Sequence, residues 1–198
     1  MAKRLVLWNP KSGKAREAAP ERARFSQDSE TTFEETESPA DARKKAQFAA
    51  SEGYEVIVAA GGDGTVNSVA NGVLDSGADV TFGVMPIGTA NDFAFSLGMP
   101  TALDDATDTI FAGNDRPLDV VELETSNQKW CYANVAAGGN SDRVTNALDD
   151  EMKATWGPLC YLRGALGVLA DMRSYRAEVV LDDDEQSDDH ERSFLSPE

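Results

Sequence analysis

Short apolar runs alternate with amphipathic stretches through the first 113 residues of the chain. Four of these runs predict strands, and they cover residues 4–8, 31–36, 56–60 and 80–85, of which the second is weak. The run at residues 56–60 has no polar alternation, which is typical of a strand buried on both faces of a parallel sheet. The alternation of strands with helical stretches predicts an α/β fold with a doubly wound parallel sheet.

Three stretches between these strands have features of helices. Residues 66–74 carry apolar side chains at helical spacing. Residues 39–52 follow Ser38, a candidate N-cap, and begin with Pro39, which is favoured at the first helical position. Residues 15–24 form a polar candidate helix, and we expect Pro20 to weaken or kink it.

The pattern changes near Asp115, where residues 118–124 and 129–136 flank a polar turn and predict a pair of antiparallel strands. Residues 182–198 are acidic and nearly free of apolar side chains, so we expect this tail to be disordered. The remaining predicted elements are helices at residues 142–152 and 159–172 and a strand at residues 176–181. We therefore expect an α/β domain at residues 1–114 and a partial β-rich domain with helices at residues 115–181.

Composition restricts the function. The chain has 198 residues, with 35 acidic and 18 basic side chains and a formal net charge of -17. This excess argues against nucleic acid as a partner, because its phosphates would be repelled. Cys131 and Cys160 lack metal-ligand spacing, and the single histidine, His190, makes a histidine metal site or a Ser-His-Asp site unlikely to be the basis of function. No apolar run is long enough to span a membrane, and we expect a soluble, cytoplasmic protein.

The glycine-rich stretch after residue 60 is the strongest candidate for chemistry. Gly61, Gly62 and Gly64 permit positive φ and a close approach to the main chain. A strand, a glycine turn and a helix N-terminus direct N–H groups at one point, which suits a phosphate. Asp63 lies inside the turn, and a carboxylate beside phosphates indicates Mg²⁺ or proton handling. The alternative is a tight turn in which the glycines are steric and Asp63 is an exposed turn residue.

Two more loops follow predicted strands, at residues 9–13 and 86–93. The first is not a Walker loop, because Trp8 stands where that motif requires its first glycine. In an open parallel sheet, ligands bind outside the carboxyl ends of the strands. We therefore expect the loops after Trp8, Ala60 and Met85 to converge on one crevice.

Together the three loops resemble the diacylglycerol kinase catalytic domain family, which includes bacterial lipid kinases and sphingosine kinases and is distantly related to NAD kinases. The resemblance covers roughly residues 5–181. It implies transfer of the ATP γ-phosphate to a lipid hydroxyl with Mg²⁺, and a diacylglycerol-like acceptor reached by peripheral contact with a membrane. It makes residues 1–114 the nucleotide-binding domain and residues 115–181 the start of an incomplete lipid-binding domain.

The resemblance also implies roles for individual residues. Those lining the nucleotide would be Asn9, Pro10, Lys11, Ser12, Gly13 and Thr36. Those holding the phosphates would be Gly61, Gly62, Asp63, Gly64, Thr65, Val66, Asn67 and Thr89. Asp63 would also be the catalytic residue beside metal and phosphate, while Asn91 and Asp92 would face the substrate. The alternatives are a solvated loop position for Lys11, and an N-cap with a first-turn acid for Asn91 and Asp92.

The sequence departs from the family pattern in two places. Members of the family continue to a later Asp-Gly motif, whose aspartate is taken as the general base, so we expect this chain to be C-terminally truncated. The connection between Gly13 and Thr31 is also short. Three functions stay open: an ATP-dependent lipid kinase, a kinase of a soluble acceptor such as NAD, and a nucleotide-binding module without catalytic activity. An incomplete sheet would leave a free edge, so we expect self-association as a homo-oligomer.

Overall fold

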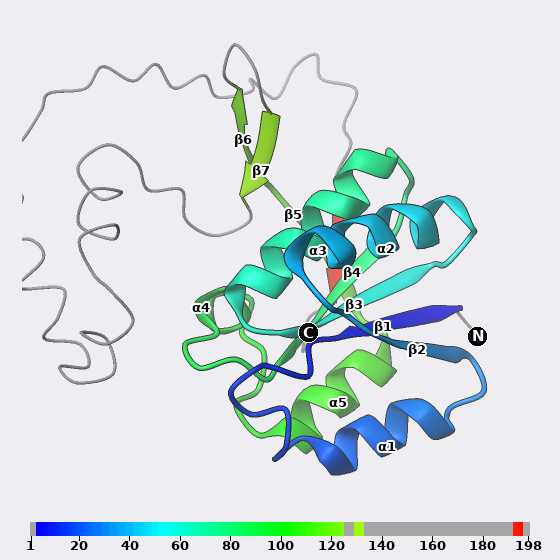
Figure 1. The fold of residues 1–198 in the computed structure, drawn as a ribbon, viewed down its shortest axis with the longest axis vertical. Helices are drawn as coiled ribbons and strands as arrows, with labels where there is room; N and C mark the ends of the chain where they lie inside the picture. Colours follow the sequence, from blue (N-terminus) through cyan, green and yellow to red (C-terminus); the bar gives the residue numbers. More distant parts are fainter. Residues whose placement is uncertain (1–2, 125–128, 133–191, 196–198) are drawn as a thin grey trace, which may run out of the picture. The chain divides into compact units, whose positions relative to one another are not determined.

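The computed structural model describes residues 3–124, 129–132 and 192–195 of the chain (Figure 1). Its strands are β1 (Arg4–Trp8), β2 (Thr31–Glu35), β3 (Val56–Gly61), β4 (Thr81–Pro86), β5 (Asp115–Leu118), β6 (Val121–Glu124), β7 (Lys129–Tyr132) and β8 (Arg192–Leu195). Its helices are α1 (Ala19–Gln27), α2 (Pro39–Ser51), α3 (Asp63–Ser76), α4 (Asp92–Ser96) and α5 (Leu103–Ala112). The first four strands confirm the predicted strands to within one residue at each end.

The main sheet has the strand order β2-β1-β3-β4-β8-β5. Its neighbouring strands pair in parallel from β2 to β8, and β5 pairs antiparallel with β8. Figure 1 shows α2 and α3 on one face of this sheet and α1 and α5 on the other. The predicted α/β fold with a doubly wound parallel sheet is therefore confirmed.

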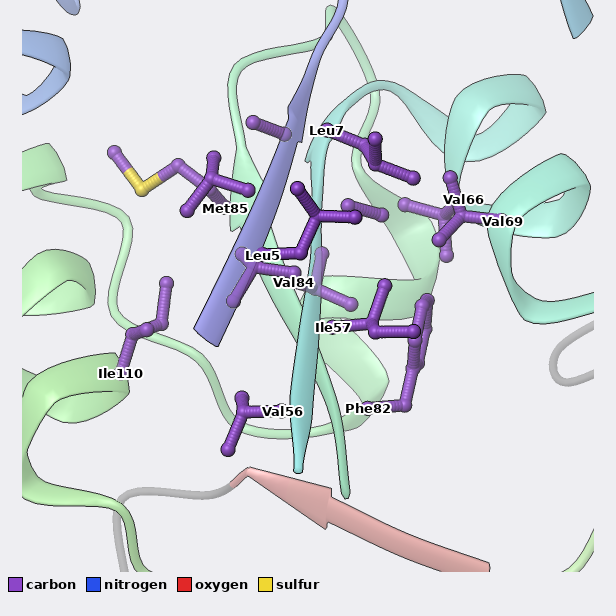
Figure 2. Close-up of a cluster of buried hydrophobic side chains, with 14 of the residues drawn as sticks. Leu5, Leu7, Val56, Ile57, Val66, Val69, Phe82, Val84, Met85 and Ile110 are labelled. Atoms are coloured by element: carbon purple, nitrogen blue, oxygen red, sulfur yellow. The ribbon is translucent and has the colours of Figure 1, made fainter. Parts of the chain in front are cut away.

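The core lies on both faces of β1, β3 and β4. Every residue of β1 and β3 is buried, as expected for strands covered by helices on both sides. Figure 2 shows Ile57 and Phe82 on the side of Val69 from α3, whereas Met85 lies on the side of Ile110 from α5. Successive side chains of a strand point to opposite faces, so an unbroken apolar run supplies both halves of the core.

The helices differ from their predicted bounds mainly at their starts. In α2 the N-cap is confirmed, because Ser38 Oγ accepts a hydrogen bond from the Asp41 N–H at 3.2 Å. The expected kink at Pro20 is wrong. Helix α1 begins at Ala19, so Pro20 lies in the first turn, where its missing N–H has no helical acceptor to lose.

The chain after α5 is organised differently from the prediction. The expected strand at residues 118–124 is divided into β5, which joins the main sheet, and β6. Strand β6 pairs antiparallel with β7, from Val121 opposite Tyr132 to Glu124 opposite Lys129, which confirms the predicted hairpin. The two strands form a separate small sheet.

Strand β8 corrects the expectation of a wholly disordered tail. Residues 192–195 pair with β4 at Phe82 and with all four residues of β5. The composition of the tail could not reveal this strand, because its main-chain partners lie far away in the sequence. A free sheet edge can order a segment that has no apolar periodicity of its own.

Several predictions lie outside the described residues, namely the helices at residues 142–152 and 159–172, the strand at residues 176–181, Cys160 and His190. The chain divides into a compact unit of residues 1–134 with 189–198 and a second unit of residues 135–188, which also lies outside them. A domain boundary after residue 114 stays a prediction. Among the described helices, none combines the length and the apolar character that crossing a membrane requires.

Helices α2 and α3 approach each other closely at Gly72. A Cβ atom on Gly72 would lie 2.8 Å from the Cβ atom of Ala46, and it would also collide with the carbonyl oxygen of Arg43. One turn further along α3, Asp75 accepts two hydrogen bonds from the Arg43 guanidinium, at 2.6 and 2.9 Å. The glycine therefore sets the distance at which α2 and α3 pack.

We expect Gly72→Ala to lower the free energy of unfolding by about 1–3 kcal/mol, because the added methyl group forces the two helices apart. The matched control is Gly64→Ala in the same helix, where an added Cβ meets nothing within 4 Å. That variant should be as stable as the wild type or more stable by about 0.5–1 kcal/mol, since alanine is the better helix former. Urea denaturation measures both, and equal effects would contradict the packing.

Candidate functional site

Three loops meet at the carboxyl edge of the sheet, and we call them the first loop (residues 9–13), the second loop (residues 61–67) and the third loop (residues 86–93). The registers place Trp8 beside Ala60 and Gly61 beside Pro86, so the strands end level with one another. Strand β1 lies between β2 and β3, and the direction of winding reverses there. Such a switch point is where open α/β sheets bind ligands.

The first loop contacts both of the others. The Asn9 side-chain Nδ2 donates to Thr65 Oγ1 in the second loop at 2.9 Å, while its Oδ1 accepts from the Lys11 N–H at 3.0 Å. The Lys14 N–H donates to the carbonyl oxygen of Ile87 in the third loop at 2.8 Å. Asn9 therefore shapes its own loop and joins it to the start of α3.

The second and third loops are joined through Asp63. Its Oδ1 accepts a hydrogen bond from the Phe93 N–H at 3.0 Å, and its Oδ2 accepts one from the Asp92 N–H at 3.3 Å. We call these two bonds the Asp63 bridge. Beside it the main chains touch, because a Cβ on Gly62 would lie 3.2 Å from Gly88 Cα. The predicted convergence of the three loops is therefore present in the structure.

Two expectations about the second loop are wrong. Helix α3 begins at Asp63 with Gly62 as its N-cap, so Asp63 is the first helical residue rather than part of a preceding turn. Gly61, Gly62 and Gly64 are not among the glycines with positive φ. At Gly61 the missing side chain makes room for Thr65, whose Oγ1 would lie 2.5 Å from an added Cβ. Close approach, rather than left-handed backbone, explains the glycines at positions 61 and 62.

Gly64 differs from its neighbours because an added Cβ there would meet nothing within 4 Å. It is the second residue of α3, and its side is open rather than packed. The N–H groups of Asp63 and Gly64 have no acceptor within the helix, because no earlier turn precedes them. The first turn of α3 thus combines free donors, the positive end of the helix dipole and open space.

The third loop is braced from within by Asn91, which has a left-handed backbone (φ 58°, ψ 41°). Its Oδ1 accepts from the Gly88 N–H at 2.8 Å, and its Nδ2 donates to the carbonyl oxygens of Gly88 at 3.1 Å and Pro86 at 3.3 Å. Asn91 is the N-cap of α4 by position, but its side chain turns back into the loop. The first N–H groups of α4 are instead satisfied by Asp63.

The other candidate residues lie at different depths. The side chain of Val66 belongs to the core, at 4% exposure, and Thr36 is buried at 5%. The main-chain N–H of Thr36 donates to the Trp8 carbonyl oxygen at 2.8 Å, and its hydroxyl lies 3.4 Å from the same oxygen. The exposed candidates are Pro10, Lys11, Gly13, Gly64, Asn67, Thr89 and Asp92, whereas Asn9, Ser12, Gly62, Asp63, Thr65 and Asn91 are partly exposed.

Sequence reasoning missed the partners of Asp63, because they are main-chain groups that no residue type announces. It also missed Asn71, a buried polar residue on α3. The available signal was its place among Ala70, Gly72 and Val73, in a stretch that is otherwise small and apolar. Within the described part of the chain, no three His, Cys, Asp or Glu side chains form a group that could hold a metal ion.

Known proteins share these features. The family model described as the diacylglycerol kinase catalytic domain matches residues 3–123. The diacylglycerol kinase of Bacillus subtilis (strain 168) is 33% identical over 187 residues, covering 92% of this chain and 60% of that protein. A "Probable lipid kinase YegS-like" protein of Klebsiella pneumoniae (strain 342) is 36% identical over 125 residues, covering 63% of this chain and 41% of that protein. The chain thus spans about half the length of these curated relatives.

The fold has solved counterparts as well. A crystal structure of a diacylglycerol kinase from Bacillus anthracis str. Sterne matches with a TM-score of 0.53 and 32% sequence identity, covering 60% of this chain and 45% of that one. The family model covers well over half of the chain and includes all three loops. The chain therefore belongs to the diacylglycerol kinase catalytic domain family, a family of lipid kinases.

Proposed function

We propose that this chain binds ATP at the three loops and serves an enzyme that transfers the γ-phosphate to the hydroxyl of a diacylglycerol-like lipid. The observation that carries the proposal is the open first turn of α3, where Gly64 leaves space beside free N–H groups. Membership of a kinase family supplies ATP as the phosphate donor. The lipid acceptor is suggested by relatives that are named diacylglycerol kinase. Reaching such an acceptor requires peripheral contact with a membrane surface.

The phosphates are proposed to lie against the start of α3. The helix has 14 residues, and anions are favoured at the N-terminus of such a helix by its dipole and its free donors. Thr65 and Asn67 lie in the same two turns, and Thr89 reaches toward the first loop, where its Oγ1 lies 3.0 Å from the position of a Cβ on Gly13. The rest of the nucleotide is then proposed to lie along the first loop, with Asn91 and Asp92 on the substrate side.

Asp63 is proposed to act beside the phosphates as well as in the Asp63 bridge. A carboxylate offers about four lone-pair directions, and the bridge occupies two of them. Magnesium is commonly held by one or two carboxylates together with phosphate oxygens and water, so a single available carboxylate fits that ion. When bound, Mg²⁺ would neutralise charge on the phosphates that are transferred.

The first test compares ATP affinity in Gly64→Ala and wild type by calorimetry. We expect at least about tenfold weaker binding, because the methyl group fills the space proposed for phosphate and hinders the N–H donors. The free energy of unfolding should not fall, so the loss cannot be ascribed to misfolding. Phe48→Ala is the control, since this exposed side chain lies on α2 outside the three loops. Unchanged ATP affinity in Gly64→Ala would exclude this phosphate position.

The second test separates the two roles of Asp63. We expect Asp63→Ala to lower the free energy of unfolding by about 1–2 kcal/mol, because two N–H groups of α4 lose their acceptor. Asp63→Asn keeps one acceptor oxygen and should recover part of that loss. Both variants should lose the gain in ATP affinity that magnesium gives the wild type. If Asp63→Asn retains the full magnesium dependence, Asp63 serves only the bridge.

The third test identifies the acceptor. Radiolabelled γ-phosphate from ATP should appear in a lipid product when the chain is incubated with diacylglycerol vesicles and magnesium. Product formed from NAD instead, with none from lipid, would indicate a soluble acceptor. ATP binding without product from either acceptor would identify the chain as a nucleotide-binding module.

A further inference from the structure

Asn71 is a buried amide side chain in the third turn of α3, at 4% exposure. Its Nδ2 donates to the carbonyl oxygen of Cys131 at 2.8 Å, and its Oδ1 accepts from the N–H of the same residue at 2.9 Å. The Nδ2 group also donates to the carbonyl oxygen of Asn67 at 2.9 Å. To Cys131 in β7, the Asn71 side chain therefore presents the donor and the acceptor that a neighbouring strand would present.

The hairpin of β6 and β7 needs such an anchor. Each strand has four residues, and an isolated two-stranded hairpin is at best marginally stable in water. Val121 and Leu123 are 61% and 43% exposed, so the described part of β6 buries little apolar surface. The N–H and C=O of Cys131 lie on the edge of β7 that faces away from β6, and Asn71 covers that edge.

We propose that Asn71 is a positioning residue that fixes the β6–β7 hairpin on α3, the helix whose first turn holds the proposed phosphate site. Three turns of one rigid helix then connect the second loop to β7, so the hairpin has a defined place relative to the nucleotide. The amide is suited to this task because a single side chain satisfies both polar groups of one peptide unit. The inference rests on the proposed function only where it refers to the nucleotide.

Charged groups surround the contact. Arg43 of α2 and Asp75 of α3 form an ion pair near it, and Glu122 and Lys129 of the hairpin form another. Burial, and then the Glu122 carboxylate, raise the pKa of the Cys131 thiol. The thiol is therefore protonated near neutral pH, and it becomes a reporter of whether the hairpin stays on α3.

The experiment compares hydrogen exchange in the wild type with that in Asn71→Leu, Asn71→Asp and the control Cys131→Ser. In Asn71→Leu the amides of residues 129–132 should exchange about tenfold faster, because the main chain of Cys131 loses both of its partners. Cys131→Ser should keep the protection, since Asn71 contacts only the main chain there. Alkylation of Cys131 in a Cys160→Ser background should be faster once Asn71 is replaced.

Asn71→Asp adds a pH signature that a loss of packing would not produce. Above its pKa the carboxylate has no donor for the Cys131 carbonyl oxygen, so residues 129–132 should lose protection. Burial raises the pKa of such a carboxyl group, and below that pKa the neutral acid both donates and accepts. Protection factors of Asn71→Asp should therefore approach those of the wild type as pH falls through the raised pKa, whereas Asn71→Leu should not recover.

Two results would overturn the inference: unchanged exchange at residues 129–132 in Asn71→Leu, or an equal rise in exchange across β1, β3 and β4. The second would mean that Asn71 supports the fold as a whole. ATP affinity is measured in the same samples by calorimetry. Failure of the wild type to bind ATP would refute the proposed function and leave the exchange result intact.

Discussion

The hydrogen bonds from the Asp92 and Phe93 N–H groups to the Asp63 carboxylate are the contact on which the site depends. They join the first residue of α3 to the first turn of α4, and so they hold together two loops that follow different strands. Without them the donors at the start of α4 would lack this acceptor and the contact between Gly62 and Gly88 would lose its lateral support. One carboxylate thus serves as a cap for one helix and as the first-turn acid of another.

The sheet makes this contact possible. Parallel pairing in a common register brings the ends of β1, β3 and β4 level, so their loops start within reach of one another. Glycine then permits main chains to touch where a side chain would separate them, as at Gly62 and Gly88. The same residue type has the opposite meaning at Gly64, where it leaves space that the protein itself does not fill.

An acidic chain that binds a polyanion presents an electrostatic problem, since the net charge is -17. Short-range donors resolve it, because main-chain N–H groups and the dipole of α3 act at contact distance. The dispersed surface carboxylates act over longer distances, and salt screens them beyond about 8–10 Å at physiological ionic strength. Affinity for phosphates is therefore compatible with the overall charge, and it would be expected to increase with ionic strength more than in a basic protein.

The sequence by itself determined the order of β1 to β4, the N-cap of α2 and the three loops, because short apolar runs and glycine-rich corners are local signals. It also determined that these loops share one edge, since parallel strands end on the same side. Only the tertiary structure decided that Asp63 binds the α4 amides, that Asn91 turns into its own loop, and that Val66 and Thr36 are buried. It alone decided β8 and the contact of Asn71 with Cys131. These features depend on main-chain groups distant in sequence, which no local pattern of side chains encodes.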